Sequence, residues 1–420
     1  MTDRRHRRDD MPVKVVFFNV GQGDCTLITF YKPGAPKADA AVLLDCGSKP
    51  GGEVAPRSQA AGPAAGTAKQ RLIDHLRNRI DDHLRDLVNP GVLDYLLISH
   101  PDEDHFNLLG DVLLDPATKK LRYTLNNVWY SMASGDYKEG NRSFRFVETL
   151  LTHPASLTSS GGHRVVNPPR VKPDQGVPEP LFLPVTPAAP NLYLIDSGAF
   201  HLKGLDSIQG AKKEALANLS SLVLVLVGAV DGSGQRQKVL LMADALVQNE
   251  KFLIDFDKDP TEKWFRREKN LWLKVGHHGS KTSTCKEWLE HTTPDGLFVS
   301  TGPLLFGGKT ATCTDSDFND RMLGDWETVR AAHRIPDPKV TSKKPLKRHW
   351  GHGYQGNTTA VPWQFGFQDM TGKGVFSTLA GQPLPPDPAV PGSPAGAWTG
   401  RDWILWIDRD GAGTYEISYE

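Results

Sequence analysis

The sequence predicts an α/β fold, and two observations carry that prediction. Short apolar runs rich in β-branched residues, which are typical of buried strands, alternate with segments that have the 3.6-residue period of amphipathic helices. Several of the predicted strands end in histidine or carboxylate side chains. Because a rigid scaffold can direct several side chains at one point, we expect a functional site where these strands end.

The first hundred residues predict four strands, at 13–19, 25–31, 41–44 and 95–99. Gly21 and Gly23 lie in the turn between the first two strands and suggest positive φ or a close backbone approach. Residues 49–69 are rich in Gly, Ala and Pro and predict a loop. Residues 70–88 have apolar side chains at helical spacing, and we expect His75 and His83 to lie on the surface of that helix.

The motif HPDEDH, residues 100–105, directly follows the strand 95–99. Its two histidines and its acidic residues can all bind a cation, and one tight turn would bring them together. The alternative is a solvated acidic turn, in which Asp102 caps the following helix and Asp104 interacts favourably with the helix dipole. A metal site is the interpretation that the rest of the chain favours.

Composition narrows the class of protein. The 420 residues include 39% hydrophobic side chains, enough for a large core, and 49 basic against 49 acidic residues give zero net charge. No global field would therefore attract nucleic acid, and a polyanion would have to bind locally. The four cysteines have no paired spacing and predict reduced thiols. We expect a cytoplasmic protein without a membrane segment and a disordered lead at residues 1–11.

The second half of the chain repeats the pattern of strands that end in polar groups. Strands are predicted at 192–195, 222–227, 238–242, 272–275 and 297–300. Asn218 and Ser221 precede the second of these strands, Asp244 follows the third, and the pair His277 and His278 follows the fourth. A carboxylate at the end of a buried strand needs partners, so these positions also predict a site.

Helices are predicted at 143–151, 247–254 and 281–291, whereas 165–189 predicts irregular structure. With Thr282 or Ser283 as N-cap, the third helix would place Ser280, Thr282 and Ser283 at its N-terminus, where an anion could bind, although simple capping explains the three side chains equally well. Further on, we expect a helix at 326–332, a basic segment at 342–354, a Pro-rich linker at 382–396 and a hairpin from 403–407 and 414–419. The basic segment could contact a polyanion, but a solvated loop is the favoured interpretation.

Six stretches together resemble the metallo-β-lactamase superfamily: NVGQGDCTLI, LLDCG, LLISHPDEDH, NLSSLVLVL, VLLMADA and LKVGHHGSKTS. More narrowly, they resemble the hydrolase domain of bacterial competence DNA-internalisation (ComEC-type) proteins. The match covers residues 13 to about 302 with gaps, and the terminal DGAGTYEIS resembles the last strand of that domain. The set of stretches is far more specific than any one of them.

The resemblance implies an αββα sandwich with a metal site between loops at one edge of the two sheets. It divides the chain into a hydrolase domain at 12–305, with an insertion at about 115–200, and a C-terminal elaboration at 306–420 that returns a final hairpin to the same fold. By position, the implied metal ligands are His100, Asp102, Asp104, His105, Asp244 and His278. The implied catalytic residues are Asp104, His277 and Asp24. Side chains expected behind the ligands or against the substrate are Asp45, Asn218, Ser221, Lys274, Ser280 and Ser283.

Two departures from the superfamily pattern bear on the metal. Asp102 replaces the middle histidine of His-x-His-x-Asp-His, and Asn218 occupies the place of the histidine of the third motif. Both changes make the set of ligands richer in oxygen, which shifts preference from zinc toward manganese or magnesium. We expect one or two divalent ions, Zn²⁺ or Mn²⁺. Gly279 favours His278 over His277 as the ligand, because the backbone can approach closely there, but the sequence leaves that choice open.

The implied function is that of a metal-dependent hydrolase, most specifically a phosphodiesterase or nuclease in which metal-bound hydroxide attacks phosphorus. The substrate would be a phosphodiester, which includes DNA, and no motif indicates a protein partner. A small substrate, such as a cyclic nucleotide or a phosphocholine ester, is an alternative that the zero net charge favours slightly. A degenerate binding domain is a second alternative, suggested by the missing histidine.

Overall fold

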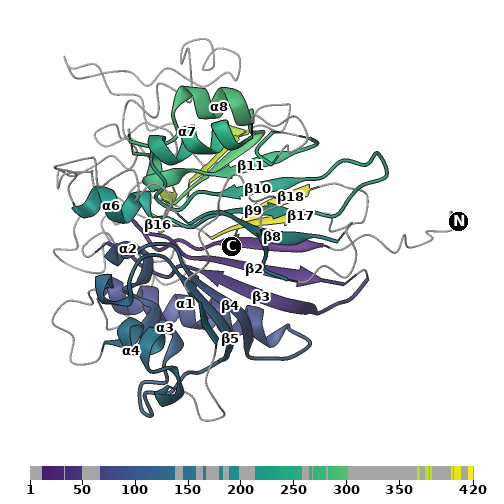
Figure 1. Cartoon of the computed structure of the whole chain (residues 1–420). Helices are drawn as coiled ribbons and strands as arrows, with labels where there is room; N and C mark the ends of the chain where they lie inside the picture. The colour runs from purple at the N-terminus through teal and green to yellow at the C-terminus, as the bar shows by residue number, and fades with distance from the viewer. Residues whose placement is uncertain are drawn as a thin grey trace, which may run out of the picture.

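Two β-sheets pack face to face at the centre of the protein, and helices cover the outer face of each sheet (Figure 1). The αββα sandwich that the resemblance implied is therefore confirmed. The computed structural model describes residues 12–32, 34–49, 67–137, 145–157, 164–166, 179–182, 189–197, 213–257, 264–266, 268–280, 282–300, 367–368, 374–377, 379–380, 399–400, 402–407 and 415–419. The expectations for 1–11, 326–332, 342–354 and 382–396 concern residues outside these ranges.

The first sheet joins strands from both ends of the chain in the order β18-β17-β1-β2-β3-β4-β5-β6. Pairing is antiparallel from β18 to β3 and parallel from β3 to β6. The strands are β1 (Val13–Phe17), β2 (Thr26–Tyr31), β3 (Ala38–Leu44), β4 (Val92–Ile98), β5 (Thr124–Tyr130), β6 (Arg164–Val166), β17 (Trp403–Ile407) and β18 (Tyr415–Tyr419).

The second sheet has the order β13-β14-β12-β11-β10-β9-β8-β7, in which β10, β11, β12 and β14 are parallel neighbours. Its strands are β7 (Glu179–Pro180), β8 (Asn191–Asp196), β9 (Val223–Val227), β10 (Lys238–Leu241), β11 (Leu271–Lys274), β12 (Gly296–Val299), β13 (Phe367–Gln368) and β14 (Gly374–Ser377). A separate short pair joins β15 (Leu379–Ala380) to β16 (Thr399–Gly400). The predicted insertion at about 115–200 contains β5 of the first sheet and β8 of the second. The domain boundaries drawn from the sequence stay predictions.

The helices are α1 (Ala68–Arg85), α2 (Glu103–Phe106), α3 (Leu109–Leu113), α4 (Phe146–Thr152), α6 (Lys213–Leu219), α7 (Val247–Phe256) and α8 (Lys286–Thr292). Helices α1, α4 and α7 and the short helix after HPDEDH were predicted. Helix α6 was not, although KEALANL consists almost entirely of strong helix formers. None of the helices in the described part of the chain has the length and hydropathy needed to cross a membrane.

The helix predicted at 281–291 begins five residues later than expected, at Lys286. Thr284 has a left-handed φ of 53°, and the buried Glu250 carboxylate of α7 accepts hydrogen bonds from the backbone N–H groups of Thr284 and Cys285. Cys285, rather than Thr282 or Ser283, is thus the N-cap. The prediction of an anion site at that helix N-terminus was wrong, because Ser280, Thr282 and Ser283 lie in the preceding turn.

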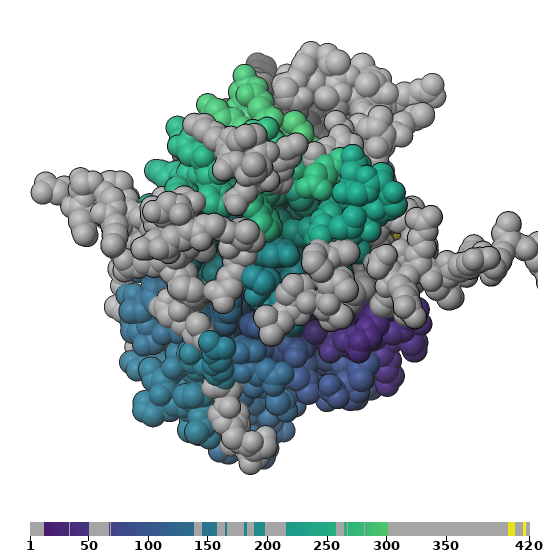
Figure 2. Space-filling model, turned by 45° about the vertical axis from the view of Figure 1, so that its right-hand side comes forward, coloured from purple at the N-terminus to yellow at the C-terminus, as the bar shows by residue number. Residues whose placement is uncertain are grey.

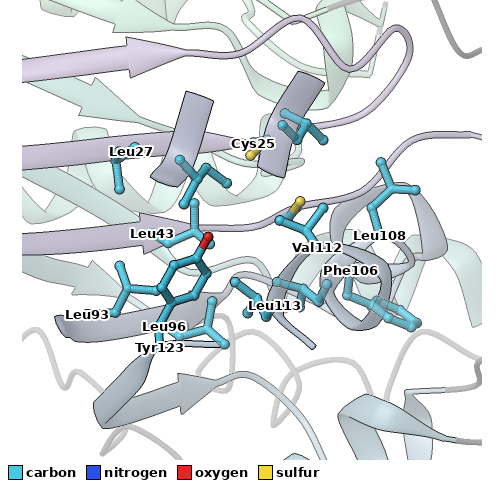
Figure 3. Packing of buried hydrophobic residues seen from close by; sticks show 14 of the residues in the cluster. Cys25, Leu27, Leu43, Leu93, Leu96, Phe106, Leu108, Val112, Leu113 and Tyr123 are labelled. Atoms are coloured by element: carbon cyan, nitrogen blue, oxygen red, sulfur yellow. The ribbon is translucent and has the colours of Figure 1, made fainter. Parts of the chain in front are cut away.

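Three layers of apolar packing hold the sandwich together. Strand side chains that point outward from the first sheet pack against α1–α4, and Figure 3 shows part of that layer around Leu43, Leu96 and Phe106. A second layer fills the space between the sheets, where the rings of Phe17 and Phe298 stack with centroids 4.3 Å apart. The third layer lies between the second sheet and helices α7 and α8. Every sheet face is therefore covered, as the near-continuous apolar runs of the strands require.

His75 and His83 of α1 are partly buried, so the prediction that they lie on the surface was wrong. His75 Nε2 is 2.8 Å from Asp402 Oδ2, and Asp402 Oδ1 accepts a 2.8 Å hydrogen bond from the backbone N–H of Asn19. The His83 ring packs on Phe18, and burial, helped by Lys14 and Arg79, lowers its pKa to about 3. Both histidines complete the contact between α1 and the first sheet.

The strand directions place all the predicted polar ends at one edge of the sandwich. Strands β1, β3 and β4 run the same way, and so do β10, β11 and β12 in the other sheet. On the face shown in Figure 2, residues of the first half of the chain lie on one side and those of the second half on the other. A ligand bound at the carboxyl ends of these strands would contact both halves.

Candidate metal centre

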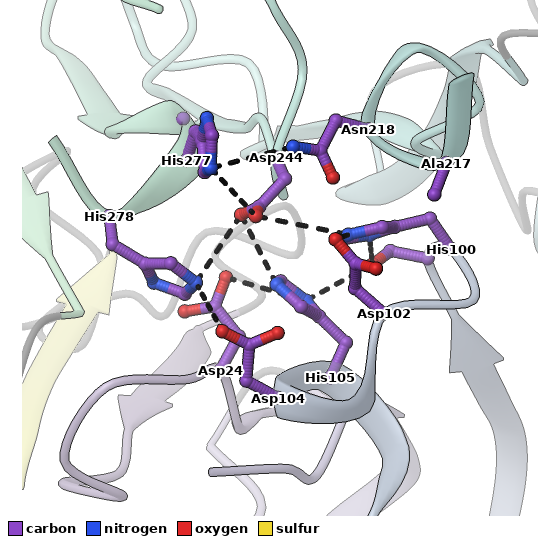
Figure 4. A network of polar contacts seen from close by, with 12 residues as sticks. Asp24, His100, Asp102, Asp104, His105, Ala217, Asn218, Asp244, His277 and His278 are labelled. Atoms are coloured by element: carbon purple, nitrogen blue, oxygen red, sulfur yellow. Dashed lines mark hydrogen bonds and ion pairs between the residues drawn. The ribbon is translucent and has the colours of Figure 1, made fainter. Parts of the chain in front are cut away.

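Nine polar side chains from the two halves converge at the carboxyl ends of the strands (Figure 4). They are Asp24, His100, Asp102, Asp104, His105, Asn218, Asp244, His277 and His278. The five of these residues that come first in the sequence, up to His105, lie in loops of the first sheet. The other four come from the second half of the chain. The predicted ligands are therefore brought together, although their roles stay predictions.

The loops of the first sheet pack backbone against backbone. The Asp24 N–H donates to the Asp104 carbonyl at 3.1 Å, the Gly47 N–H donates to the Asp24 carbonyl at 3.0 Å, and the Cys46 N–H donates to the His105 carbonyl at 2.8 Å. A Cβ on Gly23 would lie 2.6 Å from the Asp104 carbonyl oxygen, and a Cβ on Gly47 would lie 2.5 Å from the same oxygen. Glycine is required at both positions because the backbones approach too closely for a side chain.

Asp45 lies behind the histidines and fixes the orientation of His105. Its carboxylate accepts hydrogen bonds from the Ser99 N–H at 2.7 Å and the Ser99 hydroxyl at 2.6 Å, and it lies 2.8 Å from His105 Nδ1. With Nδ1 held in this way, Nε2 of His105 points at the centre. A carboxylate bonded to the far nitrogen of a histidine is the usual outer support of a metal ligand.

The half of the centre from the second sheet depends on left-handed backbone at residues other than glycine. Ala243, His277 and His278 have φ values of 45°, 45° and 51°. The His277 N–H donates to the Ala243 carbonyl at 2.9 Å, which joins the loop after β10 to the 3₁₀ turn Gly276–Gly279 after β11. His278 Nδ1 is 2.9 Å from the Ser300 carbonyl, so Nδ1 carries the hydrogen and Nε2 faces the centre. Left-handed residues of this kind are costly and cluster at functional sites.

Four buried atoms at the middle of the cluster make no hydrogen bond of good geometry and face one another: His100 Nε2, His105 Nε2, His278 Nε2 and Asp244 Oδ1. Asp244 lies between the three rings, with an oxygen 3.8 Å from His100 Nε2, 3.1 Å from His105 Nε2 and 3.5 Å from His278 Nε2. Two groups of ligand atoms compact enough for a cation are His100, His105 and Asp244, and Asp104, His105 and His278. These residues are thus positioned to bind divalent metal ions.

The charges of the cluster also fit a site for divalent cations. Burial alone would favour the neutral form of each group. Burial raises the pKa values of Asp104 and Asp244, but neighbouring histidines lower them by more. His278 holds the pKa of Asp104 at about 2, and His278 and His105 lower the pKa of Asp244. The carboxylates in turn raise the pKa values of His105 and His278, again against burial. Without a metal ion, protons therefore supply the positive charge that the carboxylates need.

Asp102 occupies the N-cap position of α2, but its side chain makes no capping hydrogen bond. Its Oδ2 lies 3.7 Å from His100 Nε2, and a third of the side chain is exposed. The capping explanation for this residue therefore lacks the hydrogen bond that it requires. Asp102 stands beside His100 at the open side of the cluster, where it could complete the coordination of a cation.

His277 is the most exposed histidine of the cluster, at 20% of its side chain. Its Nδ1 is 2.8 Å from the Thr282 hydroxyl, and its Nε2 is 3.4 Å from the Asn218 amide nitrogen and 3.9 Å from Asp244 Oδ2. Burial lowers its pKa, with a further contribution from His278. His277 is thus a neutral side chain at the rim of the cluster, whereas His278 lies inside it.

The remaining predicted residues support the cluster. The Ser283 hydroxyl donates to the Gly276 carbonyl at 2.6 Å, and Ser280 contacts Thr282, so both hold the histidine turn. Ser221 is buried, and the N–H of the next residue, Leu222, donates to the Ser99 carbonyl, which joins the halves. Lys274 forms an ion pair with Asp24.

Sequence reasoning missed two contributors, Ser99 and the Ser300 carbonyl, and gave a third, Thr282, a different role. Ser99 contacts both Asp45 and His100 Nδ1, the latter at 3.0 Å, and Thr282 and the Ser300 carbonyl hold the two histidines of the HHGS turn. Ser99 could have been found, since it directly precedes the HPDEDH motif. The Ser300 carbonyl could not, because any residue has a backbone carbonyl.

No protein-family model and no curated protein sequence matches the chain. Among solved structures, the chain is similar to the metallo-beta-lactamase fold protein YhfI from Bacillus subtilis, with 14% sequence identity and a TM-score of 0.32. That alignment covers 70% of this chain and 86% of the other. At these values the likeness transfers neither an activity nor a ligand to this chain.

Proposed function

We propose that the protein is a metal-dependent hydrolase that cleaves phosphodiesters with the help of one or two divalent ions, Zn²⁺ or Mn²⁺. The observation that carries the proposal is the convergence of three buried imidazole nitrogens, on His100, His105 and His278, around the buried carboxylate of Asp244. Leaving a buried polar atom unpaired costs about 1–3 kcal/mol. Cations that share Asp244 would give each of these nitrogens a ligand bond.

The residues present fit such ions. His100, Asp102 and Asp244 would hold one ion, and Asp104, His105 and His278 would hold a second that shares Asp244. Three imidazoles and three carboxylates form a donor set suited to zinc and to harder ions such as manganese. Divalent ions at such a centre lower the pKa of water and polarise phosphoryl oxygens.

Side chains of the cluster supply the rest of the chemistry. Asp104 lies at the open side of the cluster, at 17% exposure, where its carboxylate can orient an attacking water. His277 is neutral and faces the rim, so its Nε2 can accept a proton from that water in place of the long 3.4 Å contact with the Asn218 amide, and the protonated ring can then bond to a phosphate oxygen. Asn218 and Thr282 hold the two nitrogens of His277 and so fix the direction of its ring.

The oxygen-rich donor set favours a phosphodiester over a β-lactam, because Asp102 and Asn218 stand where the superfamily usually has histidines. DNA is the substrate that the resemblance to competence DNA-internalisation proteins favours. A small phosphodiester is a second candidate, which the balance of 49 basic and 49 acidic residues supports. A binding domain without catalysis is a third possibility, and metal analysis distinguishes it.

The test is a measurement of metal content and of hydrolysis of bis-p-nitrophenyl phosphate, cyclic nucleotides, and single- and double-stranded DNA, with Mn²⁺ or Zn²⁺. The variants are Asp104→Asn and His105→Ala, and the matched control is Asp39→Asn, a carboxylate paired with Lys32 on the surface. We expect both centre variants to lose at least ~100-fold in rate, since removing an outer-shell support alone costs ~10–100-fold.

Metal-stimulated hydrolysis that survives in both centre variants would refute the proposal. Purified protein that binds no divalent ion would instead support the non-catalytic alternative. Activity on cyclic nucleotides without activity on DNA would assign the small substrate.

A further inference from the structure

Lys274 and Asp24 form a buried ion pair between the two halves of the protein, directly beside the proposed metal centre. Lys274 is the last residue of β11 and is 3% exposed, and Asp24 follows β1 and is 4% exposed. The ammonium nitrogen lies 2.7 Å from Oδ1 and 2.9 Å from Oδ2 of Asp24. It therefore contacts both carboxylate oxygens, although the two residues are 250 positions apart in the sequence.

Asp24 is within reach of the metal ligands. One of its oxygens forms a compact group with ligand atoms of Asp244 and His278, and it forms another with Asp45 and His105. Its Oδ2 is 3.9 Å from His105 Nδ1. By position alone, Asp24 could thus bind a divalent ion together with His278 and Asp244.

The ammonium group of Lys274 competes with a metal ion for the carboxylate of Asp24. In the described part of the centre, it is opposed by five carboxylates, those of Asp24, Asp45, Asp102, Asp104 and Asp244. With neutral imidazoles, which metal ligands must be, one ammonium and two divalent ions would balance these five charges. Without the ammonium, a single negative charge would be left over at Asp24.

We propose that Lys274 acts as an internal cation, which keeps Asp24 out of the metal coordination sphere and so weakens the binding of the divalent ion that His278 and Asp244 hold. The inference rests on the proposed metal site. Asp24 is then held as a hydrogen-bond acceptor beside the ligands, and Lys274 is a positioning residue. Its flexible stem and compact charge suit a site that must be filled by one cation and no more.

The experiment compares metal stoichiometry in four proteins: wild type, Lys274→Met, Lys274→Arg and the double variant Asp24→Asn with Lys274→Met. Each is stripped with chelator, dialysed to equilibrium against Mn²⁺, and analysed for manganese per chain, with circular dichroism as the check on folding. At a free Mn²⁺ concentration that only partly fills the second site of wild type, we expect Lys274→Met to bind more Mn²⁺ per chain, because Asp24 can then join Asp244 and His278 in holding that ion. Lys274→Arg, which keeps the charge, and the double variant, which removes the carboxylate, should keep the wild-type number.

Because Lys274→Met buries an unpaired carboxylate, it is also prepared with Mn²⁺ present throughout. Recovery of folded Lys274→Met only with Mn²⁺ would support the proposal, since the ion then replaces the ammonium. Wild-type stoichiometry in folded Lys274→Met would overturn it, and so would a gain in Lys274→Arg or in the double variant. Failure of Lys274→Met to fold even with Mn²⁺ would also overturn it.

These outcomes are separable from a failure of the proposed function. Wild-type protein that binds no Mn²⁺ refutes the metal site itself. Wild-type protein that binds Mn²⁺, with no gain in Lys274→Met, refutes only the role of Lys274.

Discussion

The two halves of the metal centre use close backbone approach at glycine and left-handed backbone at other residues in different proportions. In the half from the first sheet, Gly23 and Gly47 have no side chains, and the loops touch through their backbones. In the half from the second sheet, Ala243, His277 and His278 keep their side chains and adopt left-handed backbone instead. Close approach thus dominates the first half, where Asp45 is the left-handed residue, and left-handed backbone dominates the second half, where Gly276 approaches the Ala245 carbonyl.

The outer supports of the two key histidines also differ. His105 is oriented by the side chain of Asp45, and His278 is oriented by the backbone carbonyl of Ser300. A side-chain support can be removed by substitution, and a carbonyl cannot. The first half of the centre is therefore the more vulnerable to mutation, and this difference can be tested.

The largest effect is expected for Gly47→Ala. The new Cβ would lie 2.5 Å from both the Asp104 carbonyl oxygen and the His105 nitrogen, so the HPDEDH loop must move. Overpacking of this kind costs about 1–3 kcal/mol or more, and displaced ligands should abolish metal binding. Urea denaturation and metal titration measure the two losses. Gly135→Ala is the control, because nothing lies within 4 Å of its Cβ, and equal losses in both variants would contradict the role given to Gly47.

A smaller effect is expected for Asp45→Asn, which removes the charge that orients His105. Loss of such a support lowers metal affinity by ~10–100-fold. Isothermal titration with Zn²⁺ gives the affinity. The matched variant in the other half is Ser300→Ala, which leaves the carbonyl in place and should bind metal like wild type. If Ser300→Ala weakens binding as much as Asp45→Asn does, the contrast between the two halves does not hold.

A third test uses pH. In the metal-free protein the pKa values of His105 and His278 are raised, so their contribution to stability is complete below pH ~6.5 and is lost as pH rises through the raised values. Metal binding replaces those protons and should strengthen by up to ~10-fold per pH unit for each proton released. The increase in Tm on addition of Zn²⁺ should therefore be larger at pH 8 than at pH 6. A shift that shrinks with pH would show that these histidines bind no metal.

The smallest effect is expected for Ala243→Gly. Left-handed backbone costs about 1–2 kcal/mol in residues other than glycine, and relief of that cost offsets the lost methyl group and the added chain entropy. The free energy of unfolding should change by less than ~1 kcal/mol. Ala41→Gly, in the ordinary strand β3, is the control and should lose more. A larger loss at Ala243 than at Ala41 would mean that the loop stores no strain.

Sequence patterns predicted much of this fold, because strands and helices have local periodicities. Most strands and the helices α1, α4 and α7 lie within a few residues of their expected bounds. The strand-end residues from Asp24 to His278 also converge as expected, since parallel strands present their ends at one edge. Helix α8 was placed too early because its N-terminus is set by Glu250, a residue of a different helix.

Contacts between distant segments are what the sequence could not predict. The pairing of Lys274 with Asp24, the partners of His75 and His83, and the Ser300 carbonyl that holds His278 all join residues that no local pattern connects. Such contacts depend on the completed sandwich.

The hydrogen bond from Asn19 to Asp402 has a consequence for how the protein is made. Asn19 begins the loop that carries Asp24, yet its partner lies 383 residues later, at the start of β17. A ribosome adding ~5–20 residues per second needs about 20–80 s to reach that point. During that time the nascent chain has the loop after β1 but not β17, so the contact between Asn19 and Asp402 forms only when synthesis is nearly complete.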